Sequence, residues 1–102
     1  MKLIKLDALE EAAECLKTVA HPVRLRMLEM LLSHDVTVGE LADACGIPPH
    51  MASEHLSKMK DRGLLKSKRK GRCIYYAVVK SEIKGIMKCV ATHFAHRTEH
   101  LS

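Results

Sequence analysis

A chain of 102 residues with 47% hydrophobic residues is long enough for one compact domain and too short for two. Apolar residues never run for the roughly eighteen positions of a membrane span, and no signal-peptide pattern opens the chain, so we expect a soluble, cytoplasmic protein without membrane contact. The 17 Lys and Arg against 12 Asp and Glu give a net charge of +5, which favours phosphate backbones or other anionic surfaces.

The first half of the chain predicts two consecutive helices. Residues 6–20 carry apolar side chains at three- and four-residue steps with charged residues between them, which predicts an amphipathic helix. His21-Pro22 interrupts this pattern, and proline suits the first turn of a helix. A second helix is therefore predicted from Pro22 to Leu32, ending near Ser33-His34-Asp35.

The next segment predicts a helix, a tight turn and another helix. Thr37-Val38-Gly39-Glu40 has the pattern of a capping box at a helix start, and it predicts a short helix that runs through Leu41 to about Cys45. Gly46 suits the left-handed end of that helix, and Pro48-Pro49 restarts the helical geometry. The following helix, about 49 to 62, has Ala52, Leu56 and Met59 on its inner face.

The last third predicts a β-hairpin and a final helix. Gly63 ends the preceding helix, and Leu64-Leu65 and Cys73 to Val79 have the composition of strands. Between them, residues 66–72 are predicted to form the tip of the hairpin. Residues 81–97 carry an apolar stripe that predicts a helix packed on the first helix and on a second subunit.

Positive charge is concentrated at this predicted tip. Five of the 17 basic residues fall within residues 66–72. An isolated charge run is commonly only a solvated surface, but this one directly follows a helix-turn-helix pattern, where cations can neutralise phosphates while a helix reads the bases. The basic residues predicted to contact the phosphates of double-stranded DNA are Lys58, Lys68, Arg69, Lys70 and Arg72.

The outward face of the helix at 49–62 is short and polar near its start, as a helix inserted in a major groove requires. His50, Ser53 and Ser57 can donate to or accept from base edges or phosphates. Glu54 either accepts a hydrogen bond from a cytosine amino group or is a surface acid at the rim of the interface. Ser53, Glu54 and His55 form no catalytic relay, because adjacent residues on a helix point in different directions. We expect no enzyme.

Three successive motifs resemble the ArsR/SmtB family of bacterial repressors. They are Leu16-Lys17-Thr18-Val19-Ala20-His21-Pro22-Val23-Arg24-Leu25-Arg26, Val38-Gly39-Glu40-Leu41-Ala42, and Ser53-Glu54-His55-Leu56 through Gly63-Leu64. The resemblance covers nearly the whole chain. It implies a mainly α-helical winged helix-turn-helix protein with five helices and a two-stranded wing. Residues 1–102 would form a single DNA-binding domain that dimerises through helices at 6–20 and 81–97.

The resemblance also implies repression until an inducer, often a metal ion and sometimes a thiol oxidant, lowers DNA affinity. The family's Cys-x-Cys beside the third helix is absent from Val36 to Leu41. A second family site pairs Asp-x-His at the start of the last helix with His-x-x-His near its end. His93-Phe94-Ala95-His96 fits its second half, whereas Val79 to Glu82 offers one carboxylate and no histidine.

The residues of the last helix leave three alternatives. Glu82, Cys89, His93, His96 and His100 are spaced to share one strip of a helix, and such side chains bind zinc or another transition metal. Alternatively, Cys89 or Cys15 has a redox role, or the strip is only the polar flank of a dimer helix. Cys45 and Cys73 are predicted in or near the core, and no CxxC pair occurs.

The sequence thus predicts a homodimeric repressor that binds an inverted-repeat operator in double-stranded DNA and responds to a metal ion or to thiol oxidation. Two other functions remain open at this point. One is a winged-helix module that binds an acidic protein partner, and the other is a constitutive repressor with no inducer.

Overall fold

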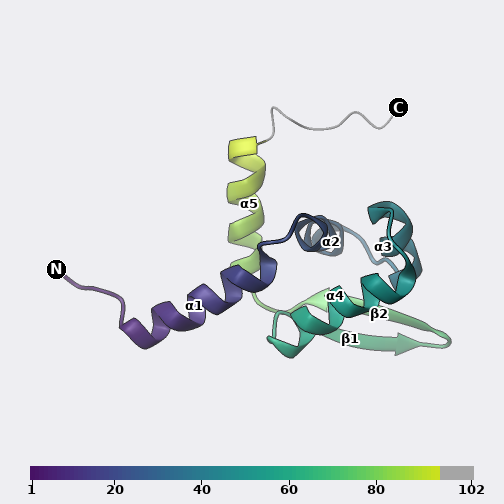
Figure 1. Ribbon diagram of the computed structural model, residues 1–102, viewed down its shortest axis with the longest axis horizontal. Coiled ribbons are helices and arrows are strands. Elements are labelled where there is room, and N and C mark those ends of the chain that lie inside the picture. The colour runs from purple at the N-terminus through teal and green to yellow at the C-terminus, as the bar shows by residue number, and fades with distance from the viewer. Residues whose placement is uncertain (95–102) are drawn as a thin grey trace.

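The computed structural model describes residues 1–94, so the predicted helical residues 95–97, with His96 among them, and His100 lie outside the described part. Its elements run in chain order as shown in Figure 1: α1 (Leu6–Val19), α2 (Pro22–Ser33), α3 (Val38–Cys45), α4 (Pro49–Asp61), β1 (Leu65–Lys70), β2 (Cys73–Val78) and α5 (Glu82–Phe94). The predicted five helices and two-stranded hairpin are confirmed. Within residues 1–94, no helix is both long enough and apolar enough to cross a membrane.

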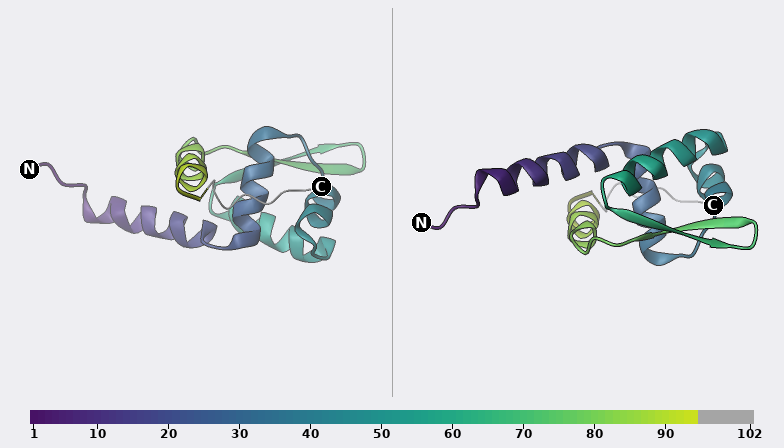
Figure 2. Two further views of the ribbon diagram at one scale, coloured as in Figure 1. Left: turned by 90° about the horizontal axis from the view of Figure 1, so that it is seen from above. Right: turned by 90° about the horizontal axis from the view of Figure 1, so that it is seen from below.

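Helices α2, α3 and α4 pack around one core with the base of the hairpin. The largest fully buried side chains are Met27, Leu28, Leu41, Leu56, Met59, Leu64 and Ile83. The predicted inner face of α4 is confirmed, because Ala52, Leu56 and Met59 are completely buried. Val19 at the end of α1 and Ile83 near the start of α5 join this core, whereas the other ends of the two helices extend away from it (Figure 1). Figure 2 shows the length of α1 projecting from the rest of the molecule.

Local signals set the helix ends. The Thr37 hydroxyl accepts from the Glu40 N–H at 3.1 Å, and the Glu40 carboxylate accepts from the Thr37 N–H at 2.9 Å. These bonds confirm the capping box, and hydrogen bonds from the backbone and hydroxyl of Thr37 lower the pKa of Glu40. Because Thr37 is the cap, α3 begins at Val38, as the capping box predicts. Gly46 ends α3 at φ 65°, a left-handed conformation that favours glycine.

The hairpin differs from the sequence-based expectation. Residues 66–70 are part of β1 rather than of a seven-residue tip, and only Gly71 and Arg72 separate the strands. The register runs from Leu65 opposite Val78 to Lys70 opposite Cys73. Gly71 has φ 62°, the sign that a two-residue hairpin turn needs at its first position. β1 can carry many charged side chains because, within the described residues, its outer edge pairs with no other strand. The outer edge of β2 instead forms a β-bridge between Tyr75 and Thr37.

Candidate nucleic-acid interface

The outer face of α4 carries polar side chains near its N-terminal end. His50, Ser53 and Ser57 are exposed, while the inner residues of the same helix are buried. Pro49 occupies the first turn, so α4 starts abruptly after the α3–α4 turn and its N-terminal end is exposed. Glu54 and Lys58 are exposed on the same helix. The predicted reading residues thus share an accessible helix, which is the geometry that contact with base edges requires.

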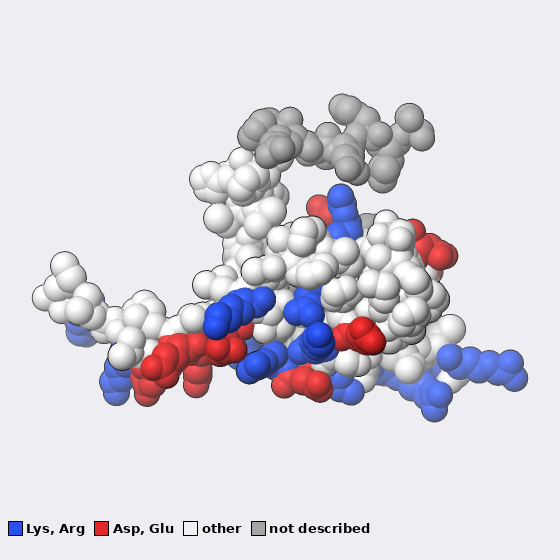
Figure 3. All heavy atoms as spheres, in the orientation of Figure 1, with Lys and Arg blue, Asp and Glu red and all other residues white. Residues whose placement is uncertain are grey.

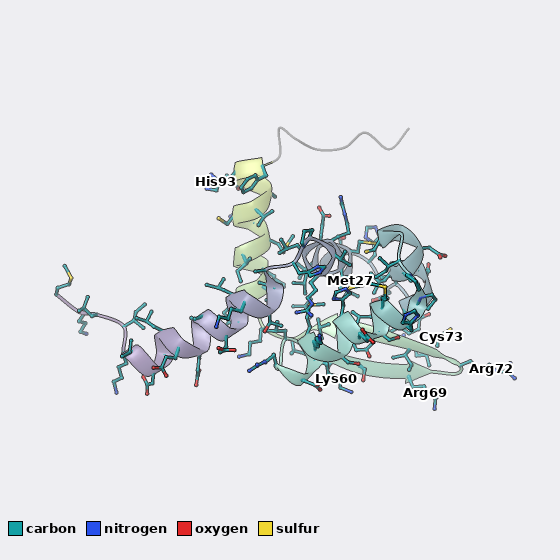
Figure 4. The ribbon with its side chains drawn as sticks, viewed as in Figure 1. Met27, Lys60, Arg69, Arg72, Cys73 and His93 are labelled. Carbon is teal, nitrogen blue, oxygen red and sulfur yellow. The ribbon has the colours of Figure 1, made fainter. Side chains whose placement is uncertain are left out.

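The basic side chains of the wing, residues 65–78, divide between two faces. Because side chains alternate along a strand, Lys66, Lys68 and Lys70 share one face of β1, and Arg69 lies on the other. The Lys70 Nζ lies 5.6 Å from the centre of the Tyr75 ring, within the range of a cation–π contact. Figure 4 shows Arg72 extending beyond the turn and Arg69 pointing down from the hairpin.

Two further cations at this surface were not among the residues predicted to contact DNA. Lys66 belongs to the basic row of β1, and Lys60 lies in the last turn of α4. The Lys60 ammonium donates to the Ser67 hydroxyl at 2.9 Å, which ties the end of α4 to the wing. Figure 3 shows Lys and Arg along the lower edge of the molecule, with Asp and Glu between them beneath α4 and Lys and Arg alone along the hairpin. The helix face and the wing therefore form one basic surface.

His21, Arg24 and His55 form a cluster that joins α4 to the start of α2. The Arg24 Nε donates to His55 Nδ1 at 3.0 Å, and the rings of His21 and His55 lie 4.7 Å apart. Burial has the largest effect and lowers the pKa of His55. His21, Arg24 and Lys58 lower this pKa further, and Glu54 raises it. The sequence places His55 in a family motif and excludes it from a catalytic relay, but no local pattern predicts this cluster.

The candidate metal ligands on α5 are only partly brought together. Cys89 and His93 are exposed and lie one helical turn apart, with His93 near the upper end of the helix in Figure 4. Glu82 begins the helix, about 10 Å from Cys89 along the axis. His96 lies outside the described residues. In residues 1–94, no group of three His, Cys, Asp or Glu side chains is arranged to hold a metal ion.

The other cysteines have different environments. Cys15 and Cys45 are half-buried against the core, and burial raises the pKa of Cys45 despite the opposing charge of Arg26. Cys73 is exposed, so its predicted place in or near the core is wrong. It pairs with Lys70 beside the hairpin turn, beyond the part of the sheet that packs on the helices.

Apolar side chains on α1 and α5 remain uncovered within the single chain. Only Thr18 and Val19 of α1 are buried, whereas Leu9 and Leu16 are 45% and 52% exposed. Phe94 at the end of α5 is 56% exposed. Large contiguous patches of exposed apolar surface are typical of interaction faces.

Comparison with known proteins agrees with this geometry. The sequence model of a family described as "Helix-turn-helix domain" matches residues 19–68. The transcriptional repressor PagR of Bacillus anthracis is 37% identical over 86 residues, which are 83% of this chain and 86% of PagR. The crystal structure of the antimony-specific repressor AntR superposes with a TM-score of 0.85 at 28% identity, covering 95% of this chain and 88% of AntR.

A homodimeric winged helix-turn-helix domain, Mb0332 from Mycobacterium bovis, superposes with a TM-score of 0.75 at 25% identity, covering 100% of this chain and 97% of that one. That domain is described as a possible ArsR-family regulator. Fold, basic surface and relatives together define a winged helix-turn-helix protein that binds DNA. The chain belongs to the ArsR/SmtB family of transcriptional repressors.

Proposed function

We propose that this protein represses transcription as a homodimer on an inverted-repeat operator in double-stranded DNA. In this proposal, α4 of each protomer enters a major groove and the wing binds flanking phosphates. The main support for this proposal is that the hydrogen bond from Lys60 to Ser67 connects α4, with its exposed polar face, to the basic wing. Residues 1–102 act as one DNA-binding domain, with α1 and α5 as its dimerisation helices.

The exposed leucines of α1 and the exposed Phe94 of α5 support the homodimer. The homodimeric assembly of the similar Mb0332 domain supports it independently. A two-fold dimer presents the same helix twice in opposite directions. An inverted repeat is the DNA sequence that matches this symmetry.

Replacing His50 or Ser53 with alanine tests the reading role of α4. We expect the difference in binding free energy between operator and random DNA to fall by about 1–3 kcal/mol, because a hydrogen bond to a base edge is removed. Competition binding with both DNAs at one salt concentration measures this difference. His93→Ala, which changes an exposed histidine of α5, is the matched control in metal-free buffer and should leave the difference unchanged.

Two outcomes would contradict this assignment. An equal loss on operator and random DNA would show that His50 and Ser53 only hold phosphates. Indifference of the unmodified protein to duplex DNA would indicate a module that binds a protein partner instead.

The same proposal includes an inducer that acts through α5. Cys89 and His93 supply a thiolate and an imidazole one turn apart, which suits zinc or a softer metal. Two donors from one chain leave a metal incompletely held, so the ion would draw further donors from the partner subunit or from His96. The similar AntR is an antimony-specific repressor, which supports a metal or metalloid response. Oxidation of Cys89, or of Cys15, is the other route to release of DNA.

Titration of the operator complex separates these two routes. If a metal is the inducer, zinc should lower operator affinity, and His93→Ala should remove the response while leaving metal-free binding intact. If Cys89 is the oxidised thiol, peroxide should release DNA and Cys89→Ser should block the release, whereas a release that survives Cys89→Ser assigns the oxidation to Cys15. Operator binding that ignores zinc, cobalt, nickel, copper and peroxide would identify a constitutive repressor.

A further inference from the structure

One guanidinium group connects three helices of the molecule. Arg24 projects from α2, and its Nη1 donates to the carbonyl oxygen of Thr18 in the last turn of α1 at 2.9 Å. Its Nε donates to Nδ1 of His55 in α4 at 3.0 Å. Arg24 therefore links the helix that carries the exposed leucines to the helix that carries the reading face.

This link fixes the protonation state of His55. A guanidinium group has only donors, so the Nδ1 atom that accepts from it must be unprotonated. The neighbouring His21 caps the start of α2, where its Nδ1 accepts from the Val23 N–H at 3.1 Å. The His55 imidazole must therefore be neutral for the bond from Arg24 to exist.

The surroundings of His55 favour its neutral form. Burial has the largest effect and opposes a positive charge on the ring. The same charge is also opposed by His21 from the α1–α2 connection, Arg24 from α2 and Lys58 from α4. Glu54 on α4 is the one opposing influence. These causes lower the pKa of His55 below its ordinary value of about 6.5.

A second connection between α1 and α4 is too weak to replace this link. The Arg62 guanidinium lies 3.5 Å from the Glu14 carboxylate, but both side chains are about half exposed, at 58% and 49%. Exposed ion pairs of this kind contribute little because water and salt screen them. The half-buried hydrogen bonds of Arg24 are therefore the main polar link between the two helices.

We propose that Arg24 and His55 are positioning residues that hold the recognition helix α4 in a fixed orientation to the dimerisation helix α1. The inference rests on the proposed homodimeric operator binding. Two α4 helices can read two half-sites only if each keeps its place relative to the dimer interface. Protonation of His55 removes the acceptor for Arg24 and adds a charge beside it, so α4 is released from α1 in acid.

The informative quantity is the ratio of operator affinity to random-DNA affinity. An extra positive charge on α4 strengthens binding to any phosphate backbone, so absolute affinity mixes two opposite effects. The ratio cancels this general attraction and reports whether the two α4 helices match the two half-sites. Because the pKa of His55 is lowered from about 6.5, the ratio should hold from about pH 7.5 to about 6.5 and fall as the pH drops further toward about 5.

Two substitutions of nearly equal shape form the test. In His55→Asn the amide oxygen takes the place of Nδ1 and accepts from Arg24 at every pH, whereas His55→Leu puts a methyl group there. We expect the wild-type ratio to fall roughly tenfold in acid, the size expected for losing a hydrogen bond to a charged group. His55→Asn should keep a high ratio at both pH values, and His55→Leu should have the low ratio at both.

Controls separate this effect from its alternatives. His34→Asn changes an exposed histidine outside the cluster and should behave as the wild type. Any contribution of His50 is common to all the proteins, so it cancels when they are compared. Thermal unfolding at each pH verifies that every variant is folded. The proposal is overturned if folded His55→Leu keeps the wild-type ratio and pH profile, whereas a wild type with no preference for operator overturns the proposed function instead.

Discussion

Replacing Lys68, Arg69, Lys70 and Arg72 with alanine is expected to weaken binding to operator and random DNA alike and to flatten its salt dependence. Each cation that neutralises a phosphate releases a condensed counterion, so the slope of log K against log salt falls by about 0.9 for each neutralised phosphate, or up to roughly 3.6 for four. Affinity measured from low to moderate salt on both DNAs gives this slope. The ratio between the two DNAs should change little, because phosphates carry no sequence information.

The alternation of side chains along β1 sharpens this experiment. Lys68 and Lys70 lie on one face of the strand, and Arg69 lies on the other with Arg72 at the turn. The double variants Lys68→Ala with Lys70→Ala, and Arg69→Ala with Arg72→Ala, should therefore differ in slope if one face of the wing meets the DNA. Lys84→Ala with Lys88→Ala on α5 removes the same charge away from the basic surface and is the matched control. An unchanged slope in all wing variants would show that the wing does not touch DNA.

The features that sequence predicted well are those decided by neighbouring residues. The capping box of Thr37 and Glu40 and the left-handed Gly46 involve residues only a few positions apart, so their geometry follows from local chemistry. The inner face of α4 follows from helical periodicity in the same way. These signals were sufficient to place the helix-turn-helix and its outward face.

The features that sequence missed depend on contacts between distant residues. The length of β1 is set by pairing with β2, which extends the strand through charged residues that local composition assigned to the tip. The bond from Arg24 to His55 joins residues 31 positions apart on two helices. No local pattern marks such a pair. Cys73 was misplaced because strand composition alone does not show where the sheet leaves the core.

The substitution Leu16→Glu is expected to abolish dimerisation and, with it, most operator affinity. Leu16 is 52% exposed on the uncovered face of α1, so a carboxylate there is solvated in the single chain but would lose water in a dimer interface. Linking two DNA-binding units raises affinity by roughly 10² to 10⁴ over either unit alone, and a monomer forfeits this gain. Sedimentation or light scattering measures the oligomeric state, and binding to one or two half-sites measures the loss.

Lys17→Gln makes the same charge change at the adjacent position and separates dimer loss from electrostatics. The Lys17 side chain is 77% exposed, and its contact with Glu14 at 3.7 Å contributes little because it is solvated. This control should remain dimeric and bind the operator as the wild type does. For Leu16→Glu we expect equal affinity for one half-site and for the inverted repeat, because a monomer engages only one at a time. If Leu16→Glu stays dimeric and still prefers the inverted repeat, α1 is not the dimerisation helix and its exposed leucines need another partner.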